Sequence, residues 1–247
     1  MVVALERGTC VWVEGLDLSG KGTFLDAMVA HARERGLVVF DVNTYQKEHD
    51  HNPLPPEFLH ADILYLSEMT YAGVGRLLRQ EITARTPRYY SASVTAQSFA
   101  LDRQILLEQV ERPARDAGMH VLKSRSVLSS LVYQQYQACQ GGEPLSLDEI
   151  RALSGNRLEL SSPDCATHVL IATAPTETLL SRLGREKQDN SKFENAEFLA
   201  SIKPFYESEM IRKTCEECGA ALAYVDLSGT REETVRLGGE WFDRIFS

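Results

Sequence analysis

The chain has 247 residues, of which 43% are hydrophobic and 25% charged, and its formal net charge is −9. This length and composition provide for a full hydrophobic core and exclude a disordered chain. The acidic balance disfavours non-specific binding to nucleic acid or to an anionic membrane. No apolar run approaches the roughly 18 residues of a membrane-spanning helix, and the N-terminus lacks a signal-peptide pattern, so we expect a cytoplasmic protein.

The five cysteines are scattered and odd in number, which suits a reducing compartment better than a disulfide framework. Cys215 and Cys218 form a C-x-x-C pair. A tetrahedral zinc site needs a second ligand pair, and none is suitably spaced, so we interpret the two residues as thiols on one helix face.

Short runs rich in β-branched residues alternate with longer segments of helical spacing, which is typical of a parallel sheet covered by helices on both faces. The expected strands lie at 9–14, 37–42, 120–124, 167–173 and 223–227. Prolines between residues 53 and 56 delay the next helix until about Glu57. A last amphipathic helix follows Asp226, with Thr230 as its N-cap. The pattern predicts an α/β fold.

The first expected strand leads into VEGLDLSGKGT, residues 13–23, which nearly matches the phosphate-binding pattern G-x-x-x-x-G-K-[ST]. A strand, a glycine-rich turn and a helix beginning near Lys21 form the context in which loop amides bind phosphate and the lysine reaches the β and γ phosphates. The hydroxyl position holds Gly22, which cannot ligate a metal, so Mg²⁺ would rest on Thr23, waters and phosphate oxygens. The residues expected to bind the nucleotide are Gly15, Ser19, Gly20, Lys21, Gly22 and Thr23.

Five segments, taken in order, are similar to motifs of the thymidylate kinase family. EGLDLSGKGT resembles the family's E-G-x-D-G-x-G-K-[ST]-T loop, and residues 101–134 resemble its A-x-D-R helix, its I-x-P-A-L-x-x-G turn and its D-R-[YF]-x-x-S-x-x-A-Y-Q signature. Residues 161–183, 189–199 and 223–234 resemble the P-D-L-T segment, the lid and the closing V-I-D-A segment. The resemblance covers nearly the whole chain and implies one P-loop domain over residues 1–247, with a five-stranded parallel sheet and a short lid at about 182–195.

The resemblance also assigns roles to individual residues. Phe99 and Arg103 lie four apart and so share a helix face, where the ring would stack on thymine and the guanidinium would donate to it. Arg125 would lie between the donor and acceptor phosphates. Ser129 and Tyr133 would line the deoxynucleoside pocket, while Asp17 would contact the sugar hydroxyl or the metal's water shell. Ordinary packing or surface charge is the alternative at each of these positions.

The expected lid segment RLGREKQDNSK, residues 182–192, is rich in cations and poor in apolar residues. We expect Arg182 to contact the nucleotide, and Arg185 and Lys192 to neutralise the transferring phosphate as the lid closes. A solvated charged helix is the alternative interpretation.

Two departures from the family pattern bear on the acceptor. Ser124 stands where the D-R signature has an aspartate that helps to hold the metal-water network. The family's phosphate-binding arginine has no clear counterpart: one alignment, anchored on Gly75 and Arg79, places Ser67 or Thr70 there, and another places Val42. Compensation would come from Lys47, Arg76 or Arg79, or the acceptor would carry no phosphate.

The sequence therefore predicts a phosphotransferase that uses ATP and Mg²⁺ to phosphorylate a deoxynucleoside monophosphate, with dTMP as the first choice. The alternatives are a kinase acting on a hydroxyl of a nucleoside or modified pyrimidine, and a non-catalytic nucleotide-binding relative. The resemblance further implies a homodimer formed through the helix around Gly75–Thr83 and the helix that carries Phe99.

Overall fold

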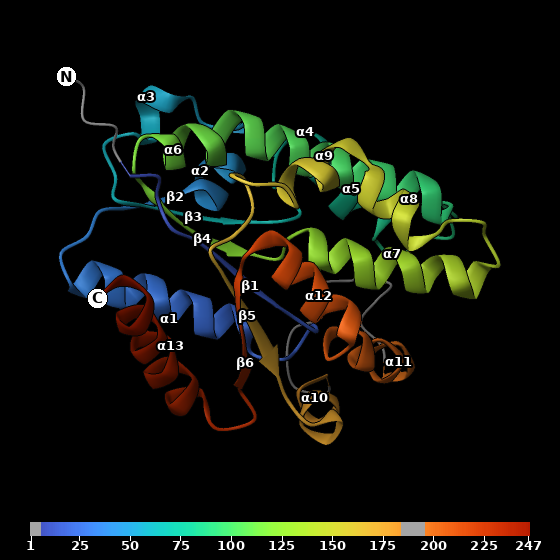
Figure 1. Ribbon diagram of the computed structural model, residues 1–247. Coiled ribbons are helices and arrows are strands. Elements are labelled where there is room, and N and C mark those ends of the chain that lie inside the picture. The colour runs from blue at the N-terminus through green and yellow to red at the C-terminus, as the bar shows by residue number, and fades with distance from the viewer. Residues whose placement is uncertain (1–5, 184–195) are drawn as a thin grey trace.

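In the described part of the chain, six parallel strands form a central sheet in the order β2-β3-β4-β1-β5-β6, with helices on both of its faces (Figure 1). The computed structural model describes residues 6–183 and 196–247. The strands are β1 (Cys10–Gly15), β2 (Val39–Asp41), β3 (Ile63–Ser67), β4 (His120–Ser124), β5 (His168–Thr173) and β6 (Ala221–Asp226).

The described helices lie in the connections between these strands, apart from the last helix, which follows the last strand. They are α1 (Lys21–Glu34), α2 (Val42–His49), α3 (Pro55–Phe58), α4 (Gly73–Leu77), α5 (Ala92–Leu106), α6 (Arg112–Asp116), α7 (Val127–Gly141), α8 (Leu147–Ala152), α9 (Ser154–Glu159), α10 (Thr176–Leu183), α11 (Ala196–Tyr206), α12 (Glu209–Cys218) and α13 (Arg231–Phe246). Two π-helical segments, η1 (Leu78–Ile82) and η2 (Leu107–Glu111), continue α4 and α5. Because η2 joins α5 directly to α6, residues 92–116 form one continuous helical segment.

The sheet separates two hydrophobic cores. Strand β1 is buried on both faces: Cys10 and Trp12 pack into the core that includes α7, whereas Val11 and Val13 pack into the core under α1 and α13. Figure 1 shows α1 and α13 side by side on one face, and α5, α7 and α9 on the other. Alternate side chains of a central parallel strand thus serve both layers, which explains its continuously apolar sequence.

The α/β prediction is confirmed, but the expectation of five strands is wrong. All five expected runs contain strands, and β3 is the sixth. It lies between β2 and β4, with Ser67 in register with Ser124. The helix expected from about Glu57 begins at Pro55, because proline needs no hydrogen-bond partner for its nitrogen at the first helical position.

The last helix, α13, begins at the N-cap that the sequence predicts. Thr230 caps α13, and its hydroxyl accepts from the Glu233 amide while the Glu233 carboxylate accepts from the Thr230 amide. Among the described residues, none of the helices combines the length and apolarity needed to cross a membrane.

Candidate functional site

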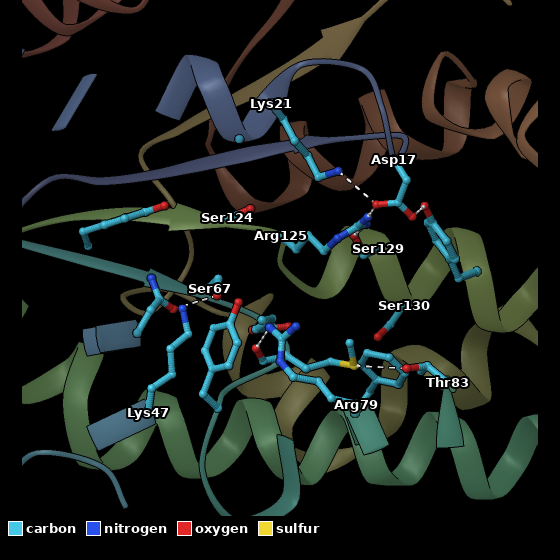
Figure 2. A pocket seen from close by; sticks show the side chains of 18 of the residues that line it. Asp17, Lys21, Lys47, Ser67, Arg79, Thr83, Ser124, Arg125, Ser129 and Ser130 are labelled. Carbon is cyan, nitrogen blue, oxygen red and sulfur yellow. Dashed lines mark hydrogen bonds and ion pairs between the residues drawn. The ribbon is translucent and has the colours of Figure 1, made fainter. Parts of the chain in front are cut away.

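A cavity of about 800 Å³ opens at the carboxyl edge of the sheet, where ligands bind in open α/β folds. Its wall combines the β1–α1 loop, α2, the segment after β3, α5 and the β4–α7 connection. Figure 2 shows Lys21, Asp17 and Arg125 on one side of this cavity and Lys47 and Arg79 on the other, with Ser67 and Ser124 between them. One continuous space therefore joins residues that lie between Asp17 and Gln134 in the sequence.

The β1–α1 loop has the backbone shape that its glycines permit. Gly15 has a φ of 127°, and a Cβ there would lie 2.4 Å from the Ala172 carbonyl oxygen. Gly20 has a φ of 94° and precedes α1, whose N-terminus no described side chain caps. The first-turn amides of α1 are thus left for an anion, as expected for a phosphate-binding loop.

Asp17 holds two cations of the cavity together. Its carboxylate accepts from Lys21 Nζ at 3.2 Å and from Arg125 Nη2, and the Tyr133 hydroxyl donates to it at 3.2 Å. Lys21 Nζ also donates to the Leu16 carbonyl oxygen at 2.9 Å. This arrangement brings together the loop lysine, the arginine after β4 and a tyrosine of α7.

The charges of this group shift one another's pKa values. Burial acts to raise the pKa of Asp17, but Arg125 and Lys21 hold it well below its ordinary value. Burial, and then the charge of Arg125, lowers the pKa of Lys21. Two cations around one carboxylate leave a net positive charge, which suits polyphosphate.

Arg125 is placed by its backbone and by α7. It has a φ of 67°, and Nη1 donates to the Ser129 hydroxyl at 3.1 Å. Ser129 donates in turn to the buried carboxylate of Glu14 at 2.8 Å, and the Tyr206 hydroxyl donates to the same carboxylate at 3.3 Å. Ser129 thus lines the cavity and also links Arg125 to β1.

The cavity wall also includes aromatic side chains and an unpaired polar atom. Phe99 and Tyr133 line the cavity together with Met69 and Gln134. Gln134 is only 1% exposed, and its Oε1 is buried with no hydrogen-bond partner among the described residues. A buried amide oxygen without a partner is costly, and a ligand that donates to it would remove that cost. Gln134 corresponds to the last residue of the A-Y-Q signature, but no role was predicted for it from the sequence.

Arg103 does not lie where the sequence analysis expects it. It is fully buried, absent from the cavity wall, and donates to Glu68, Asn156 and Ser130, with Glu159 3.0 Å from its Nε. Phe99 and Arg103 share a face of α5, but that face passes from the cavity into the protein interior. In this interior position Arg103 binds the carboxylates of Glu68 and Glu159 and does not face a ligand in the cavity.

Arg103 belongs to a group of buried charges that we call the buried cluster, formed by Glu68, Arg103, Glu111, Lys123 and Glu159. Lys123 Nζ lies 2.6 Å from a Glu68 oxygen and 2.7 Å from a Glu111 oxygen, and it also bonds Glu159. The three carboxylates are close enough to hold a metal ion, but the Lys123 ammonium already lies among them. Each carboxylate of the cluster therefore has a cationic partner within it, and Glu68 also lies on the cavity wall.

Other expected nucleotide ligands surround the loop without lining the cavity. Arg182 donates to the carbonyl oxygens of Leu18 at 3.0 Å and Leu227 at 2.8 Å, so it fixes the outer side of the loop. Ser19 is buried, and its hydroxyl has no partner among the described residues. Thr23 lies half-buried in the first turn of α1, whereas Gly22 lines the cavity with open space where a side chain would be.

The remaining expected lid residues, Arg185 and Lys192, lie outside the described residues. The lid therefore stays a prediction from the sequence.

The three positions that could correspond to the family's phosphate-binding arginine differ in whether they face the cavity. Ser67 lines the cavity and donates to Asn43 at 2.7 Å, whereas Thr70 is buried against Asp102 and Val42 is buried at the start of α2. Ser67 is thus the cavity position at the end of β3, beside Ser124 on β4. Neither serine supplies a charge.

Comparisons with known proteins place the chain in a family. The family model described as thymidylate kinase matches residues 56–218, more than half of the chain. A thymidylate kinase from Exiguobacterium sp. is 28% identical over 147 residues, which cover 60% of this chain and 56% of that protein. A probable thymidylate kinase from Caldivirga maquilingensis is 25% identical over 200 residues, which cover 80% of this chain and 79% of that protein.

Similarity of fold extends further than similarity of sequence. A thymidylate kinase structure from Candida albicans matches with a TM-score of 0.61 and 18% identity, covering 97% of this chain and 92% of that chain. The chain belongs to the thymidylate kinase family.

Proposed function

We propose that the protein is a kinase that transfers the γ-phosphate of ATP to a deoxynucleoside monophosphate, with dTMP as the preferred acceptor. The observation that carries the proposal is one cavity that Lys21 and Gly22 of the loop line together with Phe99 and Gln134. Arg125 lies along the same wall. Family membership supports this reaction class.

The part of the cavity formed by the β1–α1 loop fits a nucleoside triphosphate with Mg²⁺. The uncapped N-terminus of α1 offers amides to the phosphates, and Lys21 would exchange Asp17 for phosphate oxygens. Asp17, on the cavity wall, would offer an oxygen to Mg²⁺ directly or through water, and Thr23, in the first turn of α1, would offer another. The metal would neutralise charge on the β and γ phosphates.

The transfer step needs position and charge more than a strong base. An oxygen of the acceptor phosphate attacks the γ-phosphorus, a new P–O bond forms, and the bond to the β–γ bridging oxygen breaks, with its electron pair leaving on ADP. The second ionisation of a phosphate monoester has a pKa of about 6, so the attacking oxygen carries no proton at neutral pH. Arg125 would stabilise the charge that spreads over the transferring group.

The acceptor end fits a pyrimidine base. The Phe99 ring offers a stacking surface, and the carboxamide of Gln134 offers an acceptor and a donor that match the N3–H and O4 of thymine. We assign recognition of the base to Gln134 in place of Arg103, whose donors are occupied within the buried cluster. Tyr133 and Ser129 would border the sugar.

We also propose that the protein acts as a cytoplasmic homodimer. Leu77, Val94 and Leu101 are exposed apolar residues on α4 and α5, and Val94 and Leu101 lie seven apart on one helix face. The described cysteines are all free thiols, which suits a reducing compartment. Val94→Asp should convert the dimer to a monomer in light scattering, and a wild-type monomer would contradict this part of the proposal.

A panel of acceptors tests the proposed reaction. Purified protein with ATP and Mg²⁺ should release ADP with dTMP and less with dUMP, dCMP or dGMP, and Lys21→Ala should abolish the release. Release with thymidine, deoxyuridine or 5-hydroxymethyl-deoxyuridine alone would favour a kinase acting on a hydroxyl, which the serines at positions 67 and 124 would then explain. ATP binding without turnover of any acceptor would favour a non-catalytic relative.

A further inference from the structure

The acceptor side of the cavity lacks a charged side chain at the two neighbouring strand ends. Ser67 and Ser124 lie in register at the ends of β3 and β4, and both line the cavity. A phosphate monoester bound there carries up to two negative charges and needs a cationic donor. Arg125, which follows Ser124, is paired with Asp17, so a further cation for the acceptor phosphate has to come from another element.

Three cations near this edge differ in what they already bind. Arg76 pairs with Asp50 at the surface and does not line the cavity. Arg79 lines it, but its guanidinium donates to the backbone carbonyl oxygens of Met69 and Thr70. Both guanidinium groups therefore have protein partners.

Lys47 lines the cavity as Arg79 does, and both cations lie against the Tyr71 ring, with Lys47 Nζ 4.0 Å and Arg79 Cζ 3.9 Å from its centroid. Lys47 differs from Arg79 in its other partners. Within the described part of the chain, no carboxylate lies within ion-pair distance of this ammonium. A cation held against an aromatic face keeps its charge available to an anion in the cavity.

Two hydrogen bonds to side chains of α2 fix the position of the helix that carries Lys47. Asn43 accepts from the Ser67 hydroxyl at 2.7 Å, and Gln46 accepts from the Tyr71 amide at 2.9 Å. Both Asn43 and Gln46 are buried, so α2 is tied to the end of β3 and to the segment after it. Figure 2 shows Lys47 extending from α2 toward Ser67.

We propose that Lys47 binds the phosphate of the acceptor and thereby selects nucleoside monophosphates over nucleosides. The inference rests on the proposed kinase function. In this arrangement the cation comes from α2, a helix between β2 and β3, instead of from the strand end where Ser67 stands. Tyr71 supports the ammonium from one side and the phosphate would contact it from the other.

Binding of dTMP and of thymidine, measured by calorimetry, tests the proposal without requiring turnover. Wild-type protein should bind dTMP more tightly than thymidine. Lys47→Ala should weaken dTMP binding by about 10- to 100-fold, the range for a charge-assisted hydrogen bond, and leave thymidine binding within about two-fold. Lys47→Arg should restore most of the difference, and Arg76→Ala, a matched loss of one surface cation, should behave as wild type.

The outcomes separate this inference from the function on which it rests. Unchanged dTMP binding in Lys47→Ala, or a wild type that binds dTMP no better than thymidine, would overturn the role of Lys47. Lys47-dependent binding of dTMP without phosphorylation would support Lys47 and refute the proposed reaction. Phosphorylation of dTMP with an unchanged KM in Lys47→Ala would support the proposed reaction and refute the role of Lys47.

Discussion

Two groups of charges lie close together in this protein and differ in composition. The cavity group of Asp17, Lys21 and Arg125 has one carboxylate for two cations, whereas the buried cluster has three carboxylates for two cations. The cavity group is partly exposed, and the buried cluster is almost completely enclosed. In the cavity group, Lys21 and Arg125 can exchange the Asp17 carboxylate for a phosphate. The charges of the buried cluster are not accessible to a ligand in this way, so they pair with one another.

The pKa shifts follow the same division. In the buried cluster, burial would lower the pKa of Lys123, but Glu111, Glu159 and Glu68 raise it well above its ordinary value. Burial raises the pKa of Glu159 to about 7. With three carboxylates against two cations, the cluster favours retention of one proton. Charge is balanced within it, so we expect it to contribute to stability and the cavity group to contribute to catalysis.

The largest expected effect separates these two contributions at Arg125. Arg125→Ala should lower kcat by about 10³- to 10⁵-fold, because it removes the cation beside the transferring phosphate. Its effect on the midpoint of urea unfolding should be small, since Asp17 keeps Lys21 as a partner. Steady-state kinetics and urea titration of the same preparation measure both, and a large loss of stability with little change in kcat would reverse our assignment.

The matched change in the buried cluster is Lys123→Met. It should lower the free energy of unfolding by about 3–5 kcal/mol, because it leaves three buried carboxylates with Arg103 alone. Urea titration at neutral pH measures this loss. An equally stable variant would show that the carboxylates are satisfied without Lys123, contrary to the pairing that we infer.

Gln134→Leu tests the same distinction between stability and function at a buried polar group that has no hydrogen-bond partner. Because Gln134 Oε1 is unpaired, its removal should cost little stability, but it should raise the KM for dTMP by about ten-fold or more. Gln135→Leu, the same substitution at the neighbouring α7 position that does not line the cavity, provides a control for general disturbance of α7. Unchanged KM in Gln134→Leu would exclude Gln134 from recognition of the base.

The smallest effect is a change in pH dependence at Glu159. The raised pKa of Glu159 means that the folded protein keeps a proton that the unfolded chain releases above a glutamate pKa of about 4.3. The stability that this proton contributes is present below that pH and is lost as the pH rises toward 7. Wild type should therefore lose stability relative to Glu159→Gln across this window, as followed by urea titration at several pH values. A parallel pH profile for the two proteins would contradict the retained proton.

Much of the fold was predictable because its signals are local. The glycine-rich loop, the helix from Lys21 and the Thr230 cap each depend on a few adjacent residues. Strand β3 was missed because ILYLS is short, and a short apolar run has no period that separates a strand from a buried helical turn.

The site was predictable only in part because its partners are distant in sequence. Spacing placed Phe99 and Arg103 on one helix face, but Arg103 is turned inward by Glu68 and Glu159, 35 and 56 residues away. Lys47 is near Tyr71 only because α2 is bonded to the end of β3. Such contacts follow from topology, which no local pattern contains.

Phosphorus-31 NMR of the products formed from ATP, Mg²⁺ and dTMP tests the central claim most directly, because it identifies the oxygen that receives the phosphate. We predict the paired resonances of dTDP growing with those of ADP, and no signal from dTDP with the Arg125→Ala protein over the same time. A wild-type reaction that converts thymidine to its monophosphate but leaves dTMP unchanged would contradict the account, since the cavity would then serve a hydroxyl acceptor.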